Sequence, residues 1–304
     1  MSLDLLKCDA LVVGGGPAGL SAALVLGRCM RRVLVCDSGV YRNAKSHALH
    51  CFLAHDGVEP ADLLDMSRRQ LERYDRVDLV RARVDSIVST EGGFLARVGD
   101  REVHARAVVV ATGVVDEVPK IDGIEPLYGK SIHVCPYCDG WENREGPIAV
   151  YGRADKGAGL ALLLRQWTHD LVLCSDGPAG LSDEQSRFLQ DRGISVIETP
   201  IRKLSARDGC LNAIHFTDGY ELPRRALFFN TGQHPRSSLL EKLGCTYADN
   251  GGVACDPEGR TSVKNVYVAG DVSRDVQLAI IAAAEGARAG LALNKDLLHR
   301  DGHL

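Results

Sequence analysis

Two cysteines stand three positions apart, at Cys135 and Cys138, in the run Cys-Pro-Tyr-Cys-Asp-Gly. Thiols at this spacing can close into a small disulfide and reopen, which is two-electron chemistry. Such a pair could be a redox dithiol, half of a zinc site, or a coincidence in a chain with ten cysteines. Zinc needs about four ligands, usually from a second close pair, and His133 alone does not complete a site. We therefore favour the redox dithiol and expect no metal.

The residues next to the pair suit catalysis. Pro136 is a good first residue for a helix, and a helix beginning there would place Cys138 in its first turn. The positive end of the helix dipole would favour the thiolate form of that cysteine. Asp139 could carry a proton to or from a leaving thiolate, or it could simply stabilise the start of the helix. The candidate catalytic residues are Cys135, Cys138 and Asp139.

A glycine loop near the N-terminus predicts a dinucleotide site. Residues 14–19 read Gly-Gly-Gly-Pro-Ala-Gly and lie between a strand-like run and a helix rich in small residues. In such a loop Gly14 makes the tight turn, Gly16 leaves room for a pyrophosphate, and Gly19 lets the helix approach the strand. The next strand ends at Asp37, which is placed to accept hydrogen bonds from an adenosine ribose.

The C-terminal stretch indicates that the dinucleotide is FAD. A strand leads to Gly270 and Asp271, whose carboxylate could bond a ribityl hydroxyl. A helix beginning near Gln277 would aim its N-terminus at the pyrimidine end of an isoalloxazine. The alternative is a strand, turn and helix that only pack together. The expected cofactor-binding residues are Gly14, Gly16, Pro17, Ala18, Gly19, Asp37, Ala111, Thr112, Gly113, Gly270, Asp271, Gln277, Leu278 and Ala279.

A second loop, at residues 152–157, repeats this plan with departures. Ala154 stands where the middle glycine is expected, and its methyl group would crowd a pyrophosphate. The strand that follows ends at Cys174, and no basic cluster after it could take a 2′-phosphate. Asp176 could still hold the ribose of NADH. An NAD(P)H site is therefore doubtful: the loop argues against NADPH in the usual mode and leaves NADH open.

The repeated plan predicts an α/β fold of two Rossmann-like, three-layer nucleotide-binding domains. The segment from about Gly252 has no plan of its own and is expected to complete the first domain. The second domain is then inserted into the first. We predict an FAD-binding domain at 1–116 and 248–304, and an inserted NAD(P)H-type domain at 117–247 that carries the cysteine pair.

The composition of the chain argues against nucleic acids and membranes as partners. A net charge of −4 gives no support for a nucleic-acid or anionic-membrane partner. The longest strictly apolar run, Leu278 to Ala284, is far shorter than the roughly 20 residues of a membrane span. The first residues lack a basic region followed by an apolar stretch, so we expect no signal peptide. Most cysteines fall inside apolar runs, which favours a cytoplasmic protein with buried thiols and one special pair.

These motifs, in this order and over essentially the whole chain, resemble the low-molecular-weight thioredoxin reductase family of flavoprotein disulfide reductases. The resemblance implies an FAD domain split around an inserted NADPH domain, and a homodimer. It implies that Cys138 faces the flavin, that Cys135 exchanges with an external disulfide, and that Asp139 is the proton-transfer acid. The expected partner is a thioredoxin-like protein or a small dithiol or disulfide substrate.

The departures in the second loop make the chain more similar to atypical branches of that family. These include proteins that have lost NADPH binding, dithiol oxidases that pass electrons from FAD to oxygen, and ferredoxin-fed members. We therefore expect an FAD-dependent thiol–disulfide oxidoreductase whose electron partner is ferredoxin, a dithiol or oxygen. The alternatives are a conventional NAD(P)H-dependent thioredoxin-disulfide reductase that tolerates Ala154 and a flavin-based redox sensor. His47, His50 and His55 follow the ribose acid and could serve near the flavin or be structural.

Overall fold

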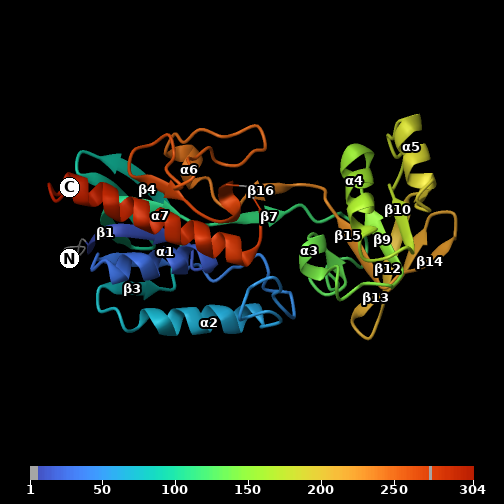
Figure 1. Ribbon diagram of the computed structural model, residues 1–304, viewed down its shortest axis with the longest axis horizontal. Helices are drawn as coiled ribbons and strands as arrows, with labels where there is room; N and C mark the ends of the chain where they lie inside the picture. Colours follow the sequence, from blue (N-terminus) through green and yellow to red (C-terminus); the bar gives the residue numbers. More distant parts are fainter. Residues whose placement is uncertain (1–5, 274–275) are drawn as a thin grey trace. The chain divides into compact units, whose positions relative to one another are not determined.

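The computed structural model describes residues 6–273 and 276–304 (Figure 1). Residues 1–5 lie outside that range, and with them the start of the N-terminal segment in which we expect no signal peptide. The chain divides into two compact units, which are described separately. The first unit comprises Met1–Ala44, Cys51–Val115 and His234–Leu304, and the second comprises Lys45–His50 and Asp116–Gln233.

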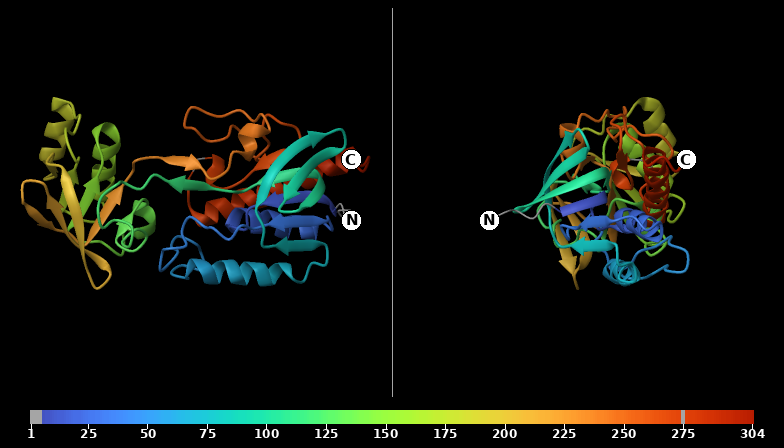
Figure 2. Two further views of the ribbon diagram at one scale, coloured as in Figure 1. Left: turned by 180° about the vertical axis from the view of Figure 1, so that it is seen from behind. Right: turned by 90° about the vertical axis from the view of Figure 1, so that its left-hand side faces the viewer.

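The first unit is built on a seven-stranded sheet with the order β3-β2-β1-β6-β5-β4, in which β17 also pairs with β6. Its strands are β1 (Leu6–Val13), β2 (Val33–Cys36), β3 (Val77–Val80), β4 (Val84–Thr90), β5 (Gly93–Val98), β6 (Arg101–Val110) and β17 (Val266–Val268). The pairs among β3, β2, β1, β6 and β17 are parallel, while β4 and β5, teal in Figure 2, are antiparallel. The C-terminal strand β17 therefore completes the sheet that the N-terminal strands begin.

Two apolar cores cover the two faces of this sheet, because successive side chains of a strand point to opposite faces. Leu11 and Val13 of β1 belong to one core, whereas Ala10 and Val12 belong to the other. The core around Val12 includes residues of three helices, and the core around Leu11 includes residues of β4, β5 and one short helix. The helices are α1 (Pro17–Arg28), α2 (Pro60–Leu71), α6 (Leu239–Lys242) and α7 (Ala279–Arg300), with a 3-10 turn η1 (Asp271–Ser273).

Helices α1 and α7 lie side by side (Figure 1) because small residues line their contact. A Cβ built on Gly286 would clash with the backbone carbonyl of Ala18. A Cβ on Gly290 would come within 3.1 Å of the Ala22 carbonyl oxygen. The close approach fixes α7 against the helix that begins at the first glycine loop.

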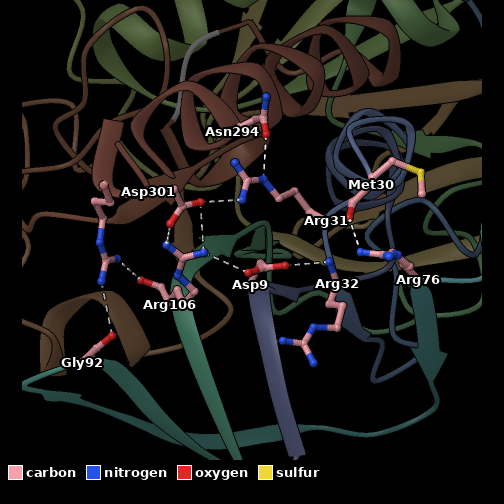
Figure 3. A network of polar contacts seen from close by, with 10 residues as sticks. Asp9, Met30, Arg31, Arg32, Arg76, Gly92, Arg106, Asn294 and Asp301 are labelled. Atoms are coloured by element: carbon pink, nitrogen blue, oxygen red, sulfur yellow. Dashed lines mark hydrogen bonds and ion pairs between the residues drawn. The ribbon is translucent and has the colours of Figure 1, made fainter. Parts of the chain in front are cut away.

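A polar network ties the end of α7 to the start of the sheet (Figure 3). Asp301 accepts hydrogen bonds from Arg106 and from Arg31, the latter at 3.0 Å. Arg106 also pairs with Asp9 at 3.1 Å, and Arg31 donates to Asn294 at 2.8 Å. Hydrogen bonds from the two guanidinium groups lower the pKa of Asp301 to about 2. The C-terminal end of α7 is thus tied to β1 and β6 and to the segment that follows α1.

The second unit has a parallel five-stranded sheet with the order β11-β10-β9-β15-β8 and an antiparallel sheet of β12, β13 and β14. Its strands are β8 (Ile132–His133), β9 (Ile148–Tyr151), β10 (Leu171–Cys174), β11 (Ser195–Ile197), β12 (Ile201–Arg207), β13 (Cys210–Phe216), β14 (Glu221–Pro223) and β15 (Ala226–Phe229). Its helices are α3 (Pro136–Asp139), α4 (Ala154–Leu164) and α5 (Asp183–Gln190). Strand, glycine loop and helix follow one another here as they do in the first unit, which is the predicted repeat.

The chain passes between the units at two short strands, β7 (Val114–Asp116) and β16 (Gln233–Pro235), which pair with each other. The second passage lies at 233/234, earlier than the predicted 247/248. The reason is that Leu239, Leu240 and Cys245 are buried in the first unit's core. The first passage, at 115/116, lies one residue from the predicted position.

No helix within the described residues combines the length and the apolar character that a membrane crossing demands.

Candidate active site

The first glycine loop combines tight backbone packing with one open position. Gly14 has φ +116°, and a Cβ there would clash with the carbonyl of Ala111. A Cβ on Gly19 would overlap the carbonyl oxygen of Gly14, so the helix can approach the strand only with glycine at 19. By contrast, a Cβ on Gly16, which caps α1, would meet no described residue within 4 Å. Gly16 therefore faces open space at the N-terminus of α1, where a phosphate is favoured.

A buried hydroxyl next to this loop lacks a partner. Ala111 donates its amide to the Val13 carbonyl at 2.8 Å, which fixes residues 111–113 beside Gly14. The Thr112 Oγ1 atom is buried and has no hydrogen-bond partner among residues 6–273 and 276–304. Leaving such a hydroxyl unpaired costs about 1–3 kcal/mol. The orphaned hydroxyl and the open face of Gly16 both fit a bound dinucleotide.

The predicted ribose acid, Asp37, is nearly fully buried at the end of β2. One carboxylate oxygen accepts a hydrogen bond from the Gly39 amide at 2.8 Å. The other accepts from the Tyr41 hydroxyl and from Arg68 at 3.3 Å. Burial and the contact with Asp37 raise the pKa of Tyr41 to about 12. A carboxylate has about four acceptor positions, so a ribose hydroxyl could share it with these donors.

The acid and the glutamine at the C-terminal end of the unit are brought together by an arginine. Arg42 donates to Asp271 Oδ2 and to Gln277 Oε1, each at 2.8 Å. Gly270 has φ +79° and donates its amide to Glu285 at 2.7 Å. Leu278 caps α7 and Ala279 is its first residue. The structure thus gathers the residues expected around the flavin in one unit.

The two cysteines form a disulfide, and α3 is the short helix expected beside them. Cys135 caps this helix, and its sulfur accepts a hydrogen bond from the Cys138 amide at 3.1 Å. Both cysteines are half-buried, whereas Tyr137 between them is 61% exposed. Elsewhere, burial raises the pKa of Cys8, Cys36 and Cys174 to about 12, which keeps those thiols protonated. The half-buried pair therefore differs from these three buried thiols.

Asp139 has a specific partner that sequence reasoning missed. Its Oδ1 lies 3.2 Å from Nδ1 of His133, a histidine that is only 6% exposed. The sequence contains the signal, a histidine six positions before the acid on the adjoining strand, but the contact needs the turn of α3. The sequence likewise gave no reason to place Arg42 and Arg68 beside Asp271 and Asp37.

The three histidines after the ribose acid have different surroundings. His50 belongs to the second unit, where its Nε2 lies 3.4 Å from Glu142. His55 packs its ring against Phe52, with centroids 5.8 Å apart, and His47 is exposed. The part of the chain that the structure describes holds no cluster of three His, Cys, Asp or Glu side chains that could bind a metal.

The second glycine loop keeps the tight turn, but Arg153 and Ala154 stand where the first loop has glycines. Gly152 and Gly157 touch, so that a Cβ on Gly152 would lie 2.9 Å from the Cα of Gly157. Ala154 begins α4 with φ +46°, a left-handed conformation that costs a residue with a side chain about 1–2 kcal/mol. Arg153, the residue before it, turns its guanidinium toward the end of β10.

At the end of β10, where a second ribose is expected, the protein's own groups make several hydrogen bonds. Arg153 donates to the carbonyl of Ser175 at 2.7 Å and to that of Asp176. The Asp176 carboxylate accepts from the Tyr151 hydroxyl at 3.2 Å and from the Ile201 amide at 2.7 Å. The guanidinium therefore lies across the end of β10, where the first unit leaves its loop open.

The comparison with protein families matches residues 8–286 to the pyridine nucleotide-disulphide oxidoreductase family. The chain belongs to this family. A thioredoxin reductase of Claviceps purpurea, tcpT, is 35% identical over 281 residues, covering 86% of each chain. The crystal structure of HlmI is 37% identical with a TM-score of 0.93, and covers 97% of this chain and 94% of its own. The crystal structure of an oxidoreductase from Agrobacterium tumefaciens is 31% identical with a TM-score of 0.91, and covers 97% and 99%.

Several predictions from the sequence are confirmed by these findings. The chain is a thioredoxin reductase-like flavoenzyme with FAD as its cofactor, and its fold is that of the two-domain members of the family. The roles of individual residues and the identity of the electron partner stay predictions.

Proposed function

We propose that this flavoenzyme interconverts a dithiol and a disulfide through Cys135 and Cys138, with an electron partner other than NADPH. The observation that carries the proposal is the second glycine loop, in which the Arg153 guanidinium lies across the end of β10 and Ala154 stands where the middle glycine is expected. The open first loop and the intact disulfide support the other half of the proposal.

The chain's own residues account for the thiol chemistry. A substrate thiolate attacks Cys135, the bond between the two sulfurs breaks, and Cys138 leaves as a thiolate that takes up a proton from Asp139. The second substrate thiol then displaces Cys135, so that the substrate loses two electrons and the pair gains them. When bound, FAD supplies the two-electron centre to which such a pair is coupled. Read in reverse, the same steps reduce an external disulfide.

The residues proposed to hold FAD lie in the first unit. Gly14, Gly16 and Gly19 form the loop for the pyrophosphate, and Asp37 is positioned for the adenosine ribose. Arg42, with Asp271 and Gln277, provides charge and hydrogen bonds toward the flavin end. Pro17 and Ala18 begin α1, so their amides belong to the helix N-terminus that favours phosphate.

The proposed partner is a thioredoxin-like protein or a small dithiol or disulfide. The name of the Claviceps purpurea relative, thioredoxin reductase, supports this class. Tyr137 lies between the cysteines with 61% of its surface exposed, so a partner that reaches the disulfide would contact this ring. The resemblance also supports a homodimer, and the buried thiols support a cytoplasmic location.

A conventional NAD(P)H-dependent reductase is the second candidate. The contact between Gly152 and Gly157 favours it, because that turn is the part of a dinucleotide loop that the second unit retains. In such an enzyme Arg153 would have to leave the end of β10 before the nucleotide could bind.

The proposal is tested with a dithiol under anaerobic conditions. Dithiothreitol should bleach the flavin absorbance of the wild-type protein, and admission of air or of a disulfide should restore it. Cys138→Ser should abolish bleaching by dithiothreitol while the protein keeps its FAD. Bleaching by dithiothreitol at an unchanged rate in Cys138→Ser would contradict the role of the pair.

A further inference from the structure

We infer that His133 is a positioning residue for the exchange reaction: it orients the Asp139 carboxylate and fixes the proton that Asp139 handles. The inference rests on the proposed function, because it needs the Cys135/Cys138 pair to exchange thiols. It goes beyond that function by assigning a role to a buried histidine outside the Cys-Pro-Tyr-Cys-Asp motif.

The imidazole is held rigidly. His133 is the last residue of β8, and this strand pairs with β15 so that His133 lies opposite Phe228. The two rings pack with their centroids 5.1 Å apart. A packed ring on a paired strand has little rotational freedom, so it can hold another side chain in one orientation.

Asp139 is held from its backbone. Its amide donates to the Cys135 carbonyl at 3.2 Å, and its own carbonyl accepts from the Asn143 side chain at 2.8 Å. These bonds fix the main chain and leave the carboxylate to be oriented by His133, 3.2 Å away. The contact therefore joins the strand before the disulfide to the acid that follows it.

The surroundings of the imidazole select one tautomer. Nε2 is buried and has no hydrogen-bond partner within residues 6–273 and 276–304. A proton on Nε2 would thus be a buried donor without an acceptor, and Nδ1 could then only accept. A proton on Nδ1 can be donated to the ionised Asp139 carboxylate. When Asp139 carries a proton on Oδ2, Nδ1–H still donates to Oδ1, and the Oδ2 hydroxyl can turn toward the thiolate.

This arrangement gives the two carboxylate oxygens of Asp139 different roles. His133 engages Oδ1, so Oδ2 is the oxygen assigned to the proton of the leaving sulfur. As the external thiolate bonds to Cys135, the disulfide bond breaks and Cys138 receives the proton from Asp139. The second substrate thiol returns a proton to Asp139 when it displaces Cys135. Two electrons pass from the dithiol to the pair, and the histidine is unchanged at the end.

The test measures exchange with dithiothreitol directly. The oxidised holoenzyme is mixed anaerobically with dithiothreitol and quenched with an alkylating reagent, and mass spectrometry follows the appearance of two additional alkylated thiols. His133→Phe keeps the ring against Phe228 but removes the donor, and it should slow exchange by about tenfold or more. His133→Asn should restore most of the rate, because its amide nitrogen lies near the position of Nδ1, whereas His133→Gln should not.

Two comparisons separate positioning from a merely structural effect. In an Asp139→Asn background, His133→Phe should cause no further slowing, because His133 acts through Asp139. His215→Phe is the matched control: it removes another histidine of the second unit that faces an acid, Glu221 at 3.6 Å, but in the separate sheet of β12, β13 and β14. That control should exchange at the wild-type rate.

The outcomes distinguish the two claims. Equal slowing by His133→Phe in the wild-type and Asp139→Asn backgrounds would overturn the inference and leave the proposed function standing. Equal rates for His133→Asn and His133→Gln would also overturn it, even if His133→Phe does not fold. A wild-type disulfide that does not react with dithiothreitol would overturn both the inference and the proposed function.

Discussion

The two glycine loops of this chain have similar sequences, but they differ in whether space remains beside the middle position of the loop. Both loops place glycines where the backbone is crowded: Gly14 and Gly19 in the first, Gly152 and Gly157 in the second. Both lead to an acid that bonds a tyrosine hydroxyl, Asp37 with Tyr41 and Asp176 with Tyr151.

The difference lies in the middle of each loop and in the nearby arginine. A side chain at Gly16 would point into free space. In the second loop, the side chains of Arg153 and Ala154 stand at the corresponding positions. Arg68 reaches Asp37 from α2, while Arg153 comes from the loop itself and bonds the backbone carbonyls after β10. A retained turn is therefore a sign of shared fold, and an open middle position is the better sign of a nucleotide site.

The largest effect is expected from making the first loop like the second. Gly16 has φ −81° and ψ −177°, a conformation open to every residue, so Gly16→Ala and Gly16→Val should fold normally. The added atoms would occupy the space for the pyrophosphate. We expect Gly16→Ala to weaken FAD binding by about 100-fold and Gly16→Val to yield colourless protein. The absorbance at the flavin bands of the purified protein measures both.

Gly159→Ala is the control for that experiment. It adds the same methyl group to the second unit, where the added atom would meet no described residue within 4 Å. This variant should retain full FAD. An equal loss of FAD in Gly159→Ala, or full FAD in Gly16→Val, would remove the distinction between the loops.

A smaller effect is expected from making the second loop like the first. Arg153→Ser together with Ala154→Gly removes the guanidinium from the end of β10 and the side chain from a left-handed residue. We expect affinity for NADH, measured by calorimetry, to rise by about tenfold. Ala154→Gly alone should raise the free energy of unfolding by about 1 kcal/mol because it removes backbone strain. If wild-type protein binds NADH as tightly as the double variant does, Arg153 does not block a nucleotide site at the end of β10.

The unpaired Thr112 hydroxyl gives a prediction for the first loop alone. Thr112→Val keeps the shape of the side chain and removes a buried group without a described partner. We expect the FAD-free protein to be as stable as wild type or more stable, and FAD binding to weaken by about tenfold. Thermal unfolding with and without FAD measures the two effects together. Loss of stability in the FAD-free variant would mean that the hydroxyl is satisfied by the protein.

The smallest effect concerns the tyrosines beside the two acids. The pKa of Tyr41 is raised to about 12, above the value near 10 of an unfolded chain. The stabilisation it gives is therefore complete below pH 10 and is lost as the pH rises through 12. Tyr41→Phe should flatten the fall in melting temperature between pH 10 and 12 by roughly a few degrees. Tyr151→Phe should flatten it too, because burial and Asp176 also raise the pKa of Tyr151. If the melting temperature of Tyr41→Phe falls with pH as steeply as that of wild type, the two tyrosines do not play matching roles.

The sequence predicted the features that depend on neighbours along the chain. The close backbone packing at Gly14 and Gly19 and the turn of helix at Pro136 both follow from short motifs. These features are local, so residue type and spacing determine them.

The features that were missed depend on residues distant in the chain. Arg42 and Asp271 are 229 positions apart, and no pattern in either segment names the other. The passage at 233/234 was placed too late because α6 is only four residues long and its burial depends on the first unit's core. The contacts of Arg153 could not be predicted, since the direction of its side chain depends on the carbonyls after β10.

The most direct test of the central claim is stopped-flow reduction of the flavin by NADPH and by dithiothreitol, under anaerobic conditions and at matched concentrations. We expect dithiothreitol to bleach the flavin rapidly in the wild-type enzyme and NADPH to leave it oxidised on the same time scale. Rapid bleaching by NADPH would contradict the account, because it would show that the second loop still delivers electrons from a nicotinamide nucleotide.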